Sequence, residues 1–153
     1  WKEYDTTLLV RDPKILCCTS TIAQRLKKPQ DLVTQTLLHP VLSRDLWARV
    51  FRHLNVDRPD EAGVIEFHDA ATMRRATLSG IGVGLISRID ALQDIRDGGL
   101  VAPFGVDALE NLPPDDVPGF FLIVPRAHKR VKSIASFCDW ITSEDWESIP
   151  DAR

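Results

Sequence analysis

Short continuous apolar runs recur along the chain, each bounded by polar residues, glycine or proline. The run Ile81–Ile86 has no polar alternation, which is typical of a strand that is covered on both faces of a sheet. The sequence predicts strands at Lys14–Cys18, Thr36–His39, Val64–Phe67, Gly82–Ile86 and Phe120–Val124. The last of these strands is also expected to be buried, and Pro125 ends it.

Between these runs, apolar residues recur at the three- and four-residue spacing of helices. The inward residues are expected to be Ile22, Ala23 and Leu26 in a first short helix, Trp47, Val50, Phe51 and Leu54 in a helix capped by Ser43, Ile89, Leu92 and Ile95 in a helix near Arg88–Asp97, and Ile134, Phe137, Cys138 and Ile141 in the last helix. Strands alternate with helices, which predicts an α/β fold with a mostly parallel or mixed sheet flanked by helices. Gly105–Gly119 follows neither period, and its prolines predict an extended loop that crosses a surface.

The segment from Phe67 to Ile86 is the most informative part of the pattern. Asp69 is a good N-cap, since its carboxylate can accept the free N–H groups of the first helical turn. Gly80 is expected to end that helix, because glycine adopts the left-handed conformation at low cost. A polar loop that follows a strand and opens a helix is where open α/β sheets bind small ligands.

Composition narrows the classes of function. Lys and Arg number 19 against 22 Asp and Glu, so the net charge of -3 gives no global attraction to nucleic acid or to anionic membranes. No apolar run approaches the roughly 20 residues that span a bilayer. The chain opens on Trp1 and its only methionine is Met73, which indicates a fragment of a longer protein.

Side chains that could carry catalysis or bind a metal ion are scattered. The four histidines form no i, i+4 pair and the cysteines form no CxxC motif, so we expect no metal ion and no cofactor. Neighbouring Cys17 and Cys18 would point to opposite faces of a strand, which predicts buried thiols in a reducing compartment. No nucleophile elbow or phosphate-binding loop is present, so we expect no enzyme. The basic stretch Arg126–Lys132 is expected to be a solvated surface.

Two capped helix starts, Thr19-Ser20 and His68-Asp69, each follow a predicted strand. Helix N-termini attract polar ligand groups through free N–H donors and the positive end of the helix dipole. The structural alternative is that these side chains only cap their own helices, and capping is expected for Ser20 and Asp69. Both roles are compatible, because a loop held rigid by its cap can also contact a ligand.

Short motifs with a shared order extend over about residues 5–144. They are Pro29-x-Asp31-Leu32, Leu37-Leu38-His39, Trp47-x-x-x-Phe51, Phe67-x-Asp69, Ala76-x-x-x-Gly80-x-Gly82-Val83-x-Leu85, Gly99-Leu100-Val101-x-Pro103-Phe104, Phe121-x-x-Val124-Pro125 and Phe137-x-x-Trp140-Ile141-x-x-Glu144. Their order and spacing resemble the C-terminal effector-binding domain of LysR-type transcriptional regulators, in the subgroup of the glycine-cleavage activator and the β-lactamase-inducing regulator.

This resemblance implies a periplasmic-binding-protein-like (type 2) fold of two α/β subdomains, with a small-molecule effector in the cleft between them. Residues 1–12 would form the end of subdomain I and the first crossing, residues 13–118 the effector-binding subdomain II, and residues 119–153 the second crossing strand and the C-terminal helix. The winged helix-turn-helix, the linker helix and the opening half of subdomain I would lie upstream of Trp1. Without that half, we expect the apolar stripe of the last helix to drive association or to shift the helix.

The resemblance implies an effector-sensing regulatory domain of a cytoplasmic transcription factor. It would act as a homodimer or homotetramer and contact DNA only through the upstream winged helix-turn-helix. The residues expected to line the effector site are Thr19, Ser20, Phe67, His68 and Asp69. Because Asp69 would repel a carboxylate, an amine-bearing or neutral polar effector fits somewhat better. Alternatives are the solute-binding protein of a transporter, which the unpaired cysteines disfavour, and an enzyme on the related scaffold.

Overall fold

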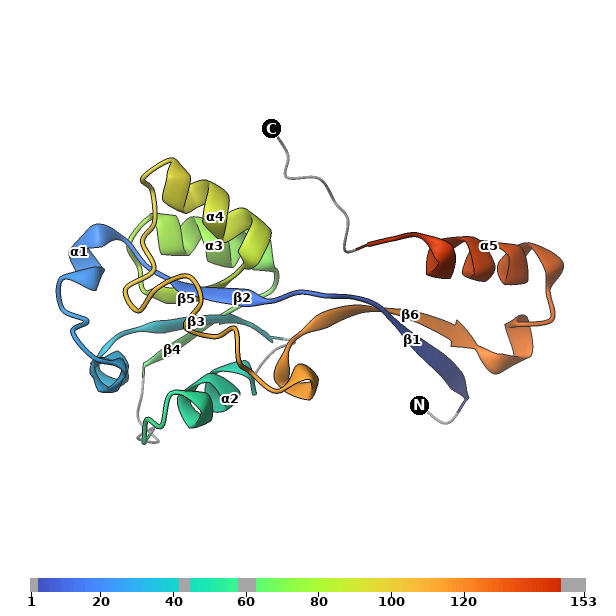
Figure 1. The fold of residues 1–153 in the computed structure, drawn as a ribbon, viewed down its shortest axis with the longest axis horizontal. Coiled ribbons are helices and arrows are strands. Elements are labelled where there is room, and N and C mark those ends of the chain that lie inside the picture. Colours follow the sequence, from blue (N-terminus) through green and yellow to red (C-terminus); the bar gives the residue numbers. More distant parts are fainter. Residues whose placement is uncertain (1–2, 42–44, 58–62, 147–153) are drawn as a thin grey trace. The chain divides into compact units, whose positions relative to one another are not determined.

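The structure is a computed structural model that describes residues 3–41, 45–57 and 63–146. The chain divides into two compact units (Figure 1). The first, which we call the ribbon unit, comprises Trp1–Asp12 and Pro118–Arg153. The second, the sheet unit, comprises Pro13–Val117. Each unit is described by itself below.

Four strands form the sheet of the sheet unit, in the order β2 (Lys14–Cys17), β5 (Val83–Ser87), β3 (Leu37–Pro40) and β4 (Val64–Phe67). Strand β2 pairs antiparallel with β5, whereas β5, β3 and β4 run parallel. The sheet is therefore mixed and mostly parallel, as the alternation of strands and helices predicted. The strand predicted at Val64–Phe67 is confirmed at its stated bounds, and the other three lie within one residue of theirs.

Helices cover both faces of this sheet. Figure 1 shows α3 (Ala70–Leu78) and α4 (Arg88–Arg96) on one face and α2 (Leu46–His53) on the other. Shorter helical segments are α1 (Ser20–Ala23), η1 (Pro29–Thr34) and η3 (Pro114–Asp116). Each helix shields one side of the strands from water, so the expected layered α/β arrangement is confirmed in this unit.

The core consists of two hydrophobic clusters, and successive strand residues belong to different ones. Leu37 packs in the cluster with Trp47, whereas Leu38 packs in the cluster with Met73. Leu85 and Ile86 divide between the clusters in the same way. This division follows from the strand pleat, which points successive side chains to opposite faces. It explains why the apolar residues of β5 follow one another without polar alternation.

Trp47 anchors the larger cluster. Its side chain is 1% exposed, and its Nε1 donates a hydrogen bond to the carbonyl oxygen of Leu38 at 3.0 Å. Val50 and Phe51 are also buried, and Leu54 is partly buried against the cluster, as the helical spacing predicted. The predicted capping residue of α2, Ser43, lies outside the described residues.

The turn between α3 and β5 depends on glycine at two positions. Gly80 has a φ of 74°, and the amide of the next residue bonds back to the carbonyl oxygen of Ala76, which ends the helix as predicted. Gly84 lies where a Cβ would collide with the Thr77 side chain. The glycine at that position allows β5 to approach α3 closely.

The orientation predicted for α4 is partly wrong. Ile89, expected to point inward, is 66% exposed, whereas Asp94 is buried at 7% exposure. Arg74 of α3 explains this arrangement, because its Nε and one terminal nitrogen donate to the two Asp94 oxygens at 2.7 and 2.8 Å. The same guanidinium donates to Asp90 at 3.0 Å. Asp94 therefore sits between the helices, where apolar periodicity alone would not place a carboxylate.

The loop predicted over Gly105–Gly119 also contributes side chains to the core. Leu109 and Leu112 are buried in the same cluster as Trp47. The His53 ring lies 3.2 Å from the carbonyl oxygen of Ala108, which links α2 to this loop. Leu109 and Leu112 belong to no strand or helix pattern, so the sequence could not reveal that they are buried.

The ribbon unit contains two strands, β1 (Tyr4–Arg11) and β6 (Gly119–Pro125), which pair antiparallel. A short turn η4 (Arg126–His128) and helix α5 (Lys132–Ser143) follow. The prediction that β6 is buried is wrong: Phe120, Phe121 and Ile123 are 62%, 49% and 45% exposed. Helix α5 of this unit has no buried residue either.

Candidate functional site

The carboxyl ends of three parallel strands meet at one edge of the sheet unit, which we call the carboxyl edge. In the strand register, Pro40 of β3 lies beside Phe67 of β4. Ser87 ends β5 and lies beside Lys14, the first residue of β2, so the chain enters the sheet unit at the same edge. Open α/β sheets bind ligands in the crevice outside the carboxyl ends of their strands, at the point where the strand order reverses.

Phe67, His68 and Asp69 lie together at the carboxyl edge. Phe67 is half-buried at the end of β4, and His68 is exposed in the link to α3. Among the residues that the structure describes, none forms a hydrogen bond or an ion pair with the His68 ring. This imidazole is therefore available to an incoming polar molecule.

Asp69 caps α3, as predicted. One carboxylate oxygen accepts the backbone N–H of Thr72 at 2.7 Å, and the other accepts the Thr72 hydroxyl at 2.9 Å. These hydrogen bonds, with the backbone one contributing most, lower the pKa of Asp69 below its ordinary value of 3.8. The carboxylate is therefore charged at neutral pH, and both of its oxygens are already engaged in holding the loop.

Thr19 and Ser20 lie at the opposite edge of the sheet. Strand β2 is antiparallel to β5, so its last residue Cys17 pairs with Gly84 near the start of β5. Thr19 is close to Gly80, beyond the C-terminal end of the helix that Asp69 opens. A helix of nine residues is about 13.5 Å long. The five predicted site residues therefore form two separate groups, which this unit does not bring together.

The expected cap at Ser20 is also absent. Ser20 is the first residue of α1, and Thr19 occupies the N-cap position without a side-chain capping bond. Because α1 has only four residues, a side-chain cap would stabilise very little helix. The reason for grouping Ser20 with Asp69, namely that both cap a helix after a strand, therefore fails for Ser20.

His39 at the carboxyl edge was not among the predicted site residues. It is 5% exposed, with Nδ1 2.9 Å from the carbonyl oxygen of Pro40 and Nε2 3.8 Å from a carboxylate oxygen of Glu66. The contact with Glu66 links the end of β3 to the end of β4. The signal that could have revealed it is a polar residue that ends an apolar strand run, at the same place in the pattern as His68.

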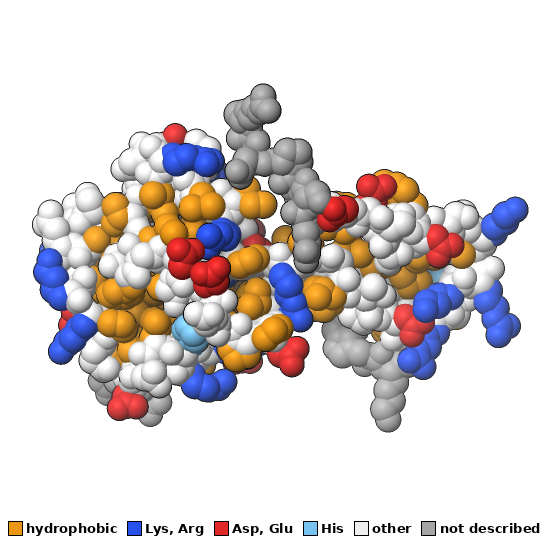
Figure 2. Space-filling model, in the orientation of Figure 1, with side chains coloured by type: hydrophobic (Ala, Val, Ile, Leu, Met, Phe, Trp, Pro, Cys, Tyr) orange, Lys and Arg blue, Asp and Glu red, His pale blue; other side chains and the backbone are white. Residues whose placement is uncertain are grey.

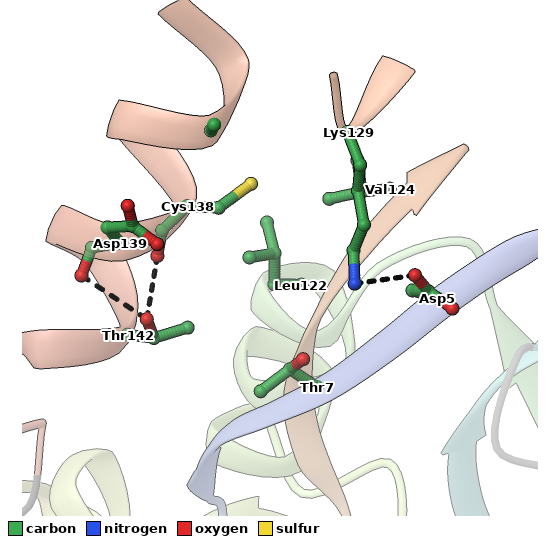
Figure 3. Close-up of a pocket in the computed structure, with 9 residues that line it drawn as sticks. Asp5, Thr7, Leu122, Val124, Lys129, Cys138, Asp139 and Thr142 are labelled. Atoms are coloured by element: carbon green, nitrogen blue, oxygen red, sulfur yellow. Dashed lines mark hydrogen bonds and ion pairs between the residues drawn. The ribbon is translucent and has the colours of Figure 1, made fainter. Parts of the chain in front are cut away.

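A cavity of about 330 Å³ lies in the ribbon unit, between α5 and the two strands (Figure 3). Its lining residues are Asp5, Thr7, Leu122, Val124, Lys129, Ala135, Cys138, Asp139 and Thr142. Lys129 Nζ lies 2.6 Å from one Asp5 oxygen, and Arg126 Nε lies 3.0 Å from the other. Hydrogen bonds from Lys129 and then Arg126 lower the pKa of Asp5. None of the five predicted site residues lines this cavity.

The two thiols of the sheet unit, Cys17 and Cys18, are free and fully buried. Burial, together with the neighbouring Cys18 and Asp94, raises the pKa of Cys17 to about 12, and burial raises the pKa of Cys18 to about 11. Within residues 3–41, 45–57 and 63–146, no three side chains of His, Cys, Asp or Glu are placed to hold a metal ion. In the same described part, no helix is long and apolar enough to cross a membrane.

Comparison with known sequences identifies the family. The sequence model described as the LysR substrate binding domain matches residues 1–146. The chain belongs to this family. Among curated relatives of this LysR domain, the glycine cleavage system transcriptional activator of Escherichia coli K12 is 32% identical over 120 residues. The transcriptional activator AmpR of Rhodobacter capsulatus is 27% identical over 147 residues.

The matched regions cover most of this LysR domain but only part of each relative. They cover 78% of this chain and 37% of the Escherichia coli activator, and 96% of this chain and 48% of Rhodobacter capsulatus AmpR. The chain thus spans less than half of the length of either relative. Both are transcriptional activators, and neither is a solute-binding protein or an enzyme, so these alternatives are not favoured.

Solved structures match the fold of the LysR domain. The AmpR effector-binding domain from Citrobacter freundii superposes with a TM-score of 0.70 at 21% identity, over 93% of this chain and 68% of that chain. The full-length regulator LysG from Corynebacterium glutamicum with bound effector Arg gives 0.67 at 16% identity, over 93% and 46%. The predicted family and its periplasmic-binding-protein-like (type 2) fold are therefore confirmed.

Proposed function

We propose that this chain is the effector-sensing part of a LysR-type transcription factor, which binds a small molecule and transmits the change to DNA-binding domains elsewhere in the full-length protein. The observation that carries the proposal is the family match over residues 1–146. Supporting it, two curated relatives are transcriptional activators, and a structural neighbour was solved with arginine as its effector. Such a protein acts where its DNA is, in the cytoplasm.

In this proposal the sheet unit, with residue 118, is subdomain II of the family fold, and residues 1–12 and 119–153 of the ribbon unit belong to subdomain I. The sheet unit supports its role by having a complete core on both sheet faces. A rigid core is needed behind an effector site, because the loops at its edge must keep their geometry before the ligand arrives.

The residues at the carboxyl edge form the part of the effector site that the sheet unit provides. Phe67 provides an apolar wall, His68 a hydrogen-bonding ring, and Asp69 holds the loop by capping α3. The negative charge of Asp69 disfavours a carboxylate at this position, since like charges repel over short distances. An amine-bearing or neutral polar group is the effector chemistry that fits this edge.

Effector binding would regulate transcription by shifting the protein between two states. A ligand can shift such an equilibrium only by binding one state more tightly than the other. In a homodimer or homotetramer, the shift would change how the paired DNA-binding domains are held. The effector must therefore contact groups, such as His68, whose surroundings differ between the two states.

The test of the site compares two substitutions in the full-length regulator, with transcription from its target promoter as the readout. His68→Ala should reduce induction by the physiological stimulus while leaving promoter DNA binding intact. Thr19→Ala is the matched control, because Thr19 lies at the opposite edge of the same sheet. Unchanged induction in His68→Ala, or equal loss in both variants, would contradict the proposed site.

The test of the wider function is the coding sequence upstream of Trp1. A winged helix-turn-helix followed by a long linker helix is expected. A secretion signal there would contradict a DNA regulator and favour solute capture instead. This outcome is independent of the two substitutions, so the function and the site can fail separately.

A further inference from the structure

His39 is a buried titratable side chain to which the proposed function assigns no role. It is the third residue of β3 and is 5% exposed. The sheet unit is rich in hydrophobic side chains, which Figure 2 shows even on the surface of the face it draws. A polar ring buried in such a unit needs polar partners, because unpaired nitrogens would cost free energy. The partners of His39 therefore indicate what the ring does.

The His39 ring contacts both strands at the place where their pairing ends. In the strand register, His39 lies opposite Glu66, and the last pair is Pro40 with Phe67. Nδ1 lies 2.9 Å from the carbonyl oxygen of Pro40, and Nε2 lies 3.8 Å from a carboxylate oxygen of Glu66. One contact therefore involves a member of the last pair, and the other involves the residue immediately before Phe67.

The chemistry of the two partners fixes the orientation of the ring. A carbonyl oxygen can only accept a hydrogen bond, so Nδ1 carries a proton and donates it to the Pro40 carbonyl. This hydrogen bond holds the ring with Nε2 towards Glu66. The distance of 3.8 Å is longer than a hydrogen bond, and a proton on Nε2 makes the contact an attraction between opposite charges.

We propose that His39 is a positioning residue for the effector site at the carboxyl edge, and that it acts through Glu66. This inference rests on the proposed function of that edge. Because the His39 ring is buried, it holds the end of β4 in place rather than contacting the effector. Phe67 and His68 follow Glu66 directly in the chain, so the position of Glu66 limits where both can lie. Binding sites keep their geometry when supporting residues hold the residues that touch the ligand.

The first experiment tests the orientation of the ring by ring-nitrogen NMR of the chain with isotope-labelled histidine. The proposal predicts that Nδ1 of His39 is protonated. The signals of His39 are those that vanish in His39→Gln, which assigns them. A neutral ring with its proton on Nε2 would leave the Pro40 carbonyl without this donor and would overturn the proposal. The measurement needs no effector, so it is independent of the proposed function.

The second experiment separates the two contacts by replacing the ring with amides. The amide nitrogen of glutamine can donate from about the position of Nε2, and that of asparagine from about the position of Nδ1. His39→Gln therefore keeps a donor towards Glu66, whereas His39→Asn keeps only the donor to Pro40. Backbone NMR order parameters over residues 67–69 should fall from about 0.85 towards about 0.6 in His39→Asn and stay high in His39→Gln. Equal order parameters in the two variants would overturn the proposal.

The matched control for these substitutions is His53→Asn. It removes the ring contact of another histidine of the sheet unit, with the carbonyl oxygen of Ala108. His53 is the last residue of α2, the helix that follows β3, so it lies at the far end of that helix from the carboxyl edge. Its loss should leave the order parameters over residues 67–69 unchanged. A fall equal to that in His39→Asn would show general loosening of the unit and would overturn the positioning role.

The third experiment measures transcription by the full-length regulator in the growth medium that induces the wild type. His39→Asn should lower induction by about two- to tenfold, and His39→Gln should restore it. His68→Ala reports on the proposed site in the same assay. If His68→Ala lowers induction and His39→Asn does not, the positioning role is wrong while the proposed site stands. If His68→Ala has no effect, the proposed site is wrong and the role of His39 falls with it.

Discussion

The two units of this chain bury their apolar residues to very different extents. In the sheet unit, both faces of a four-stranded sheet are covered, and Leu37, Leu38 and Val83 have no exposed surface. In the ribbon unit, β6 is similarly apolar in sequence, yet Phe120 and Phe121 stay largely exposed. Similar strand sequences therefore end in opposite environments, according to what packs on them.

The difference lies in the number of layers rather than in the hydrophobicity of the strands. Isolated two-stranded sheets are marginally stable, whereas three or more strands with a covered face are stable. The described part of the ribbon unit has two strands and one helix without a buried residue, and Val124 is its one buried apolar side chain. We therefore expect the sheet unit to carry the cooperative stability of the chain.

The largest expected effect contrasts the two tryptophans that lie in helices. Trp47→Ala should cost about 3–5 kcal/mol of unfolding free energy, because it leaves a cavity and removes the hydrogen bond to Leu38. Trp140→Ala should cost less than about 0.5 kcal/mol in the monomer, because the ring is 54% exposed. Urea unfolding at low protein concentration, followed by far-UV circular dichroism, measures both. Equal losses would refute the contrast between the units.

A smaller effect contrasts two ion pairs. Asp94→Ala should cost about 1–3 kcal/mol, because it leaves the Arg74 guanidinium without its two-pronged partner between α3 and α4. Asp5→Ala removes a surface pair with Lys129 and Arg126 and should leave the unfolding midpoint unchanged. Thermal unfolding of the two variants compares them. A destabilised Asp5→Ala would mean that the ribbon unit is part of the cooperative core.

The smallest effect is a pH dependence at the carboxyl edge. The pKa of Asp69 is lowered in the folded chain, so its charged form stabilises the fold above the ordinary value of 3.8. This contribution is lost as the pH falls through 3.8 towards the lower folded pKa. Asp69→Asn keeps a capping oxygen but cannot titrate, so its stability should fall less steeply with acid. An equally steep loss of stability with acid in Asp69→Asn and in the wild-type chain would contradict the capping role.

Most of the fold could be predicted because the signals are local. Strand runs, the Asp69 cap and the Gly80 stop each act over a few neighbouring residues, and all three lie where the sequence placed them. Two failures were of another kind. Ile89 faces solvent because Arg74, a residue of a different helix, draws Asp94 inward. The exposure of Phe121 depends on which layers cover β6, and no pattern within the strand records that.

The predicted site shows the same limit. Phe67, His68 and Asp69 are consecutive, so their proximity needed no knowledge of the fold. Thr19 was grouped with them because it also follows a strand, but β2 runs antiparallel to its neighbour and ends at the other edge. Strand direction is a property of the whole sheet, and a strand's own sequence does not reveal it. His39 was not among the predicted site residues for a similar reason, since one of its two contacts is with Glu66 of β4.

Amide hydrogen exchange of the whole chain tests the contrast between the two units most directly. Exchange reports the free energy of opening for each backbone N–H, from local fraying to global unfolding. The account predicts that amides of β3 and β5 exchange only through global unfolding, while amides of β1, β6 and α5 exchange much faster at low protein concentration. Equal protection of both units under those conditions would contradict the claim that the sheet unit alone holds a complete core.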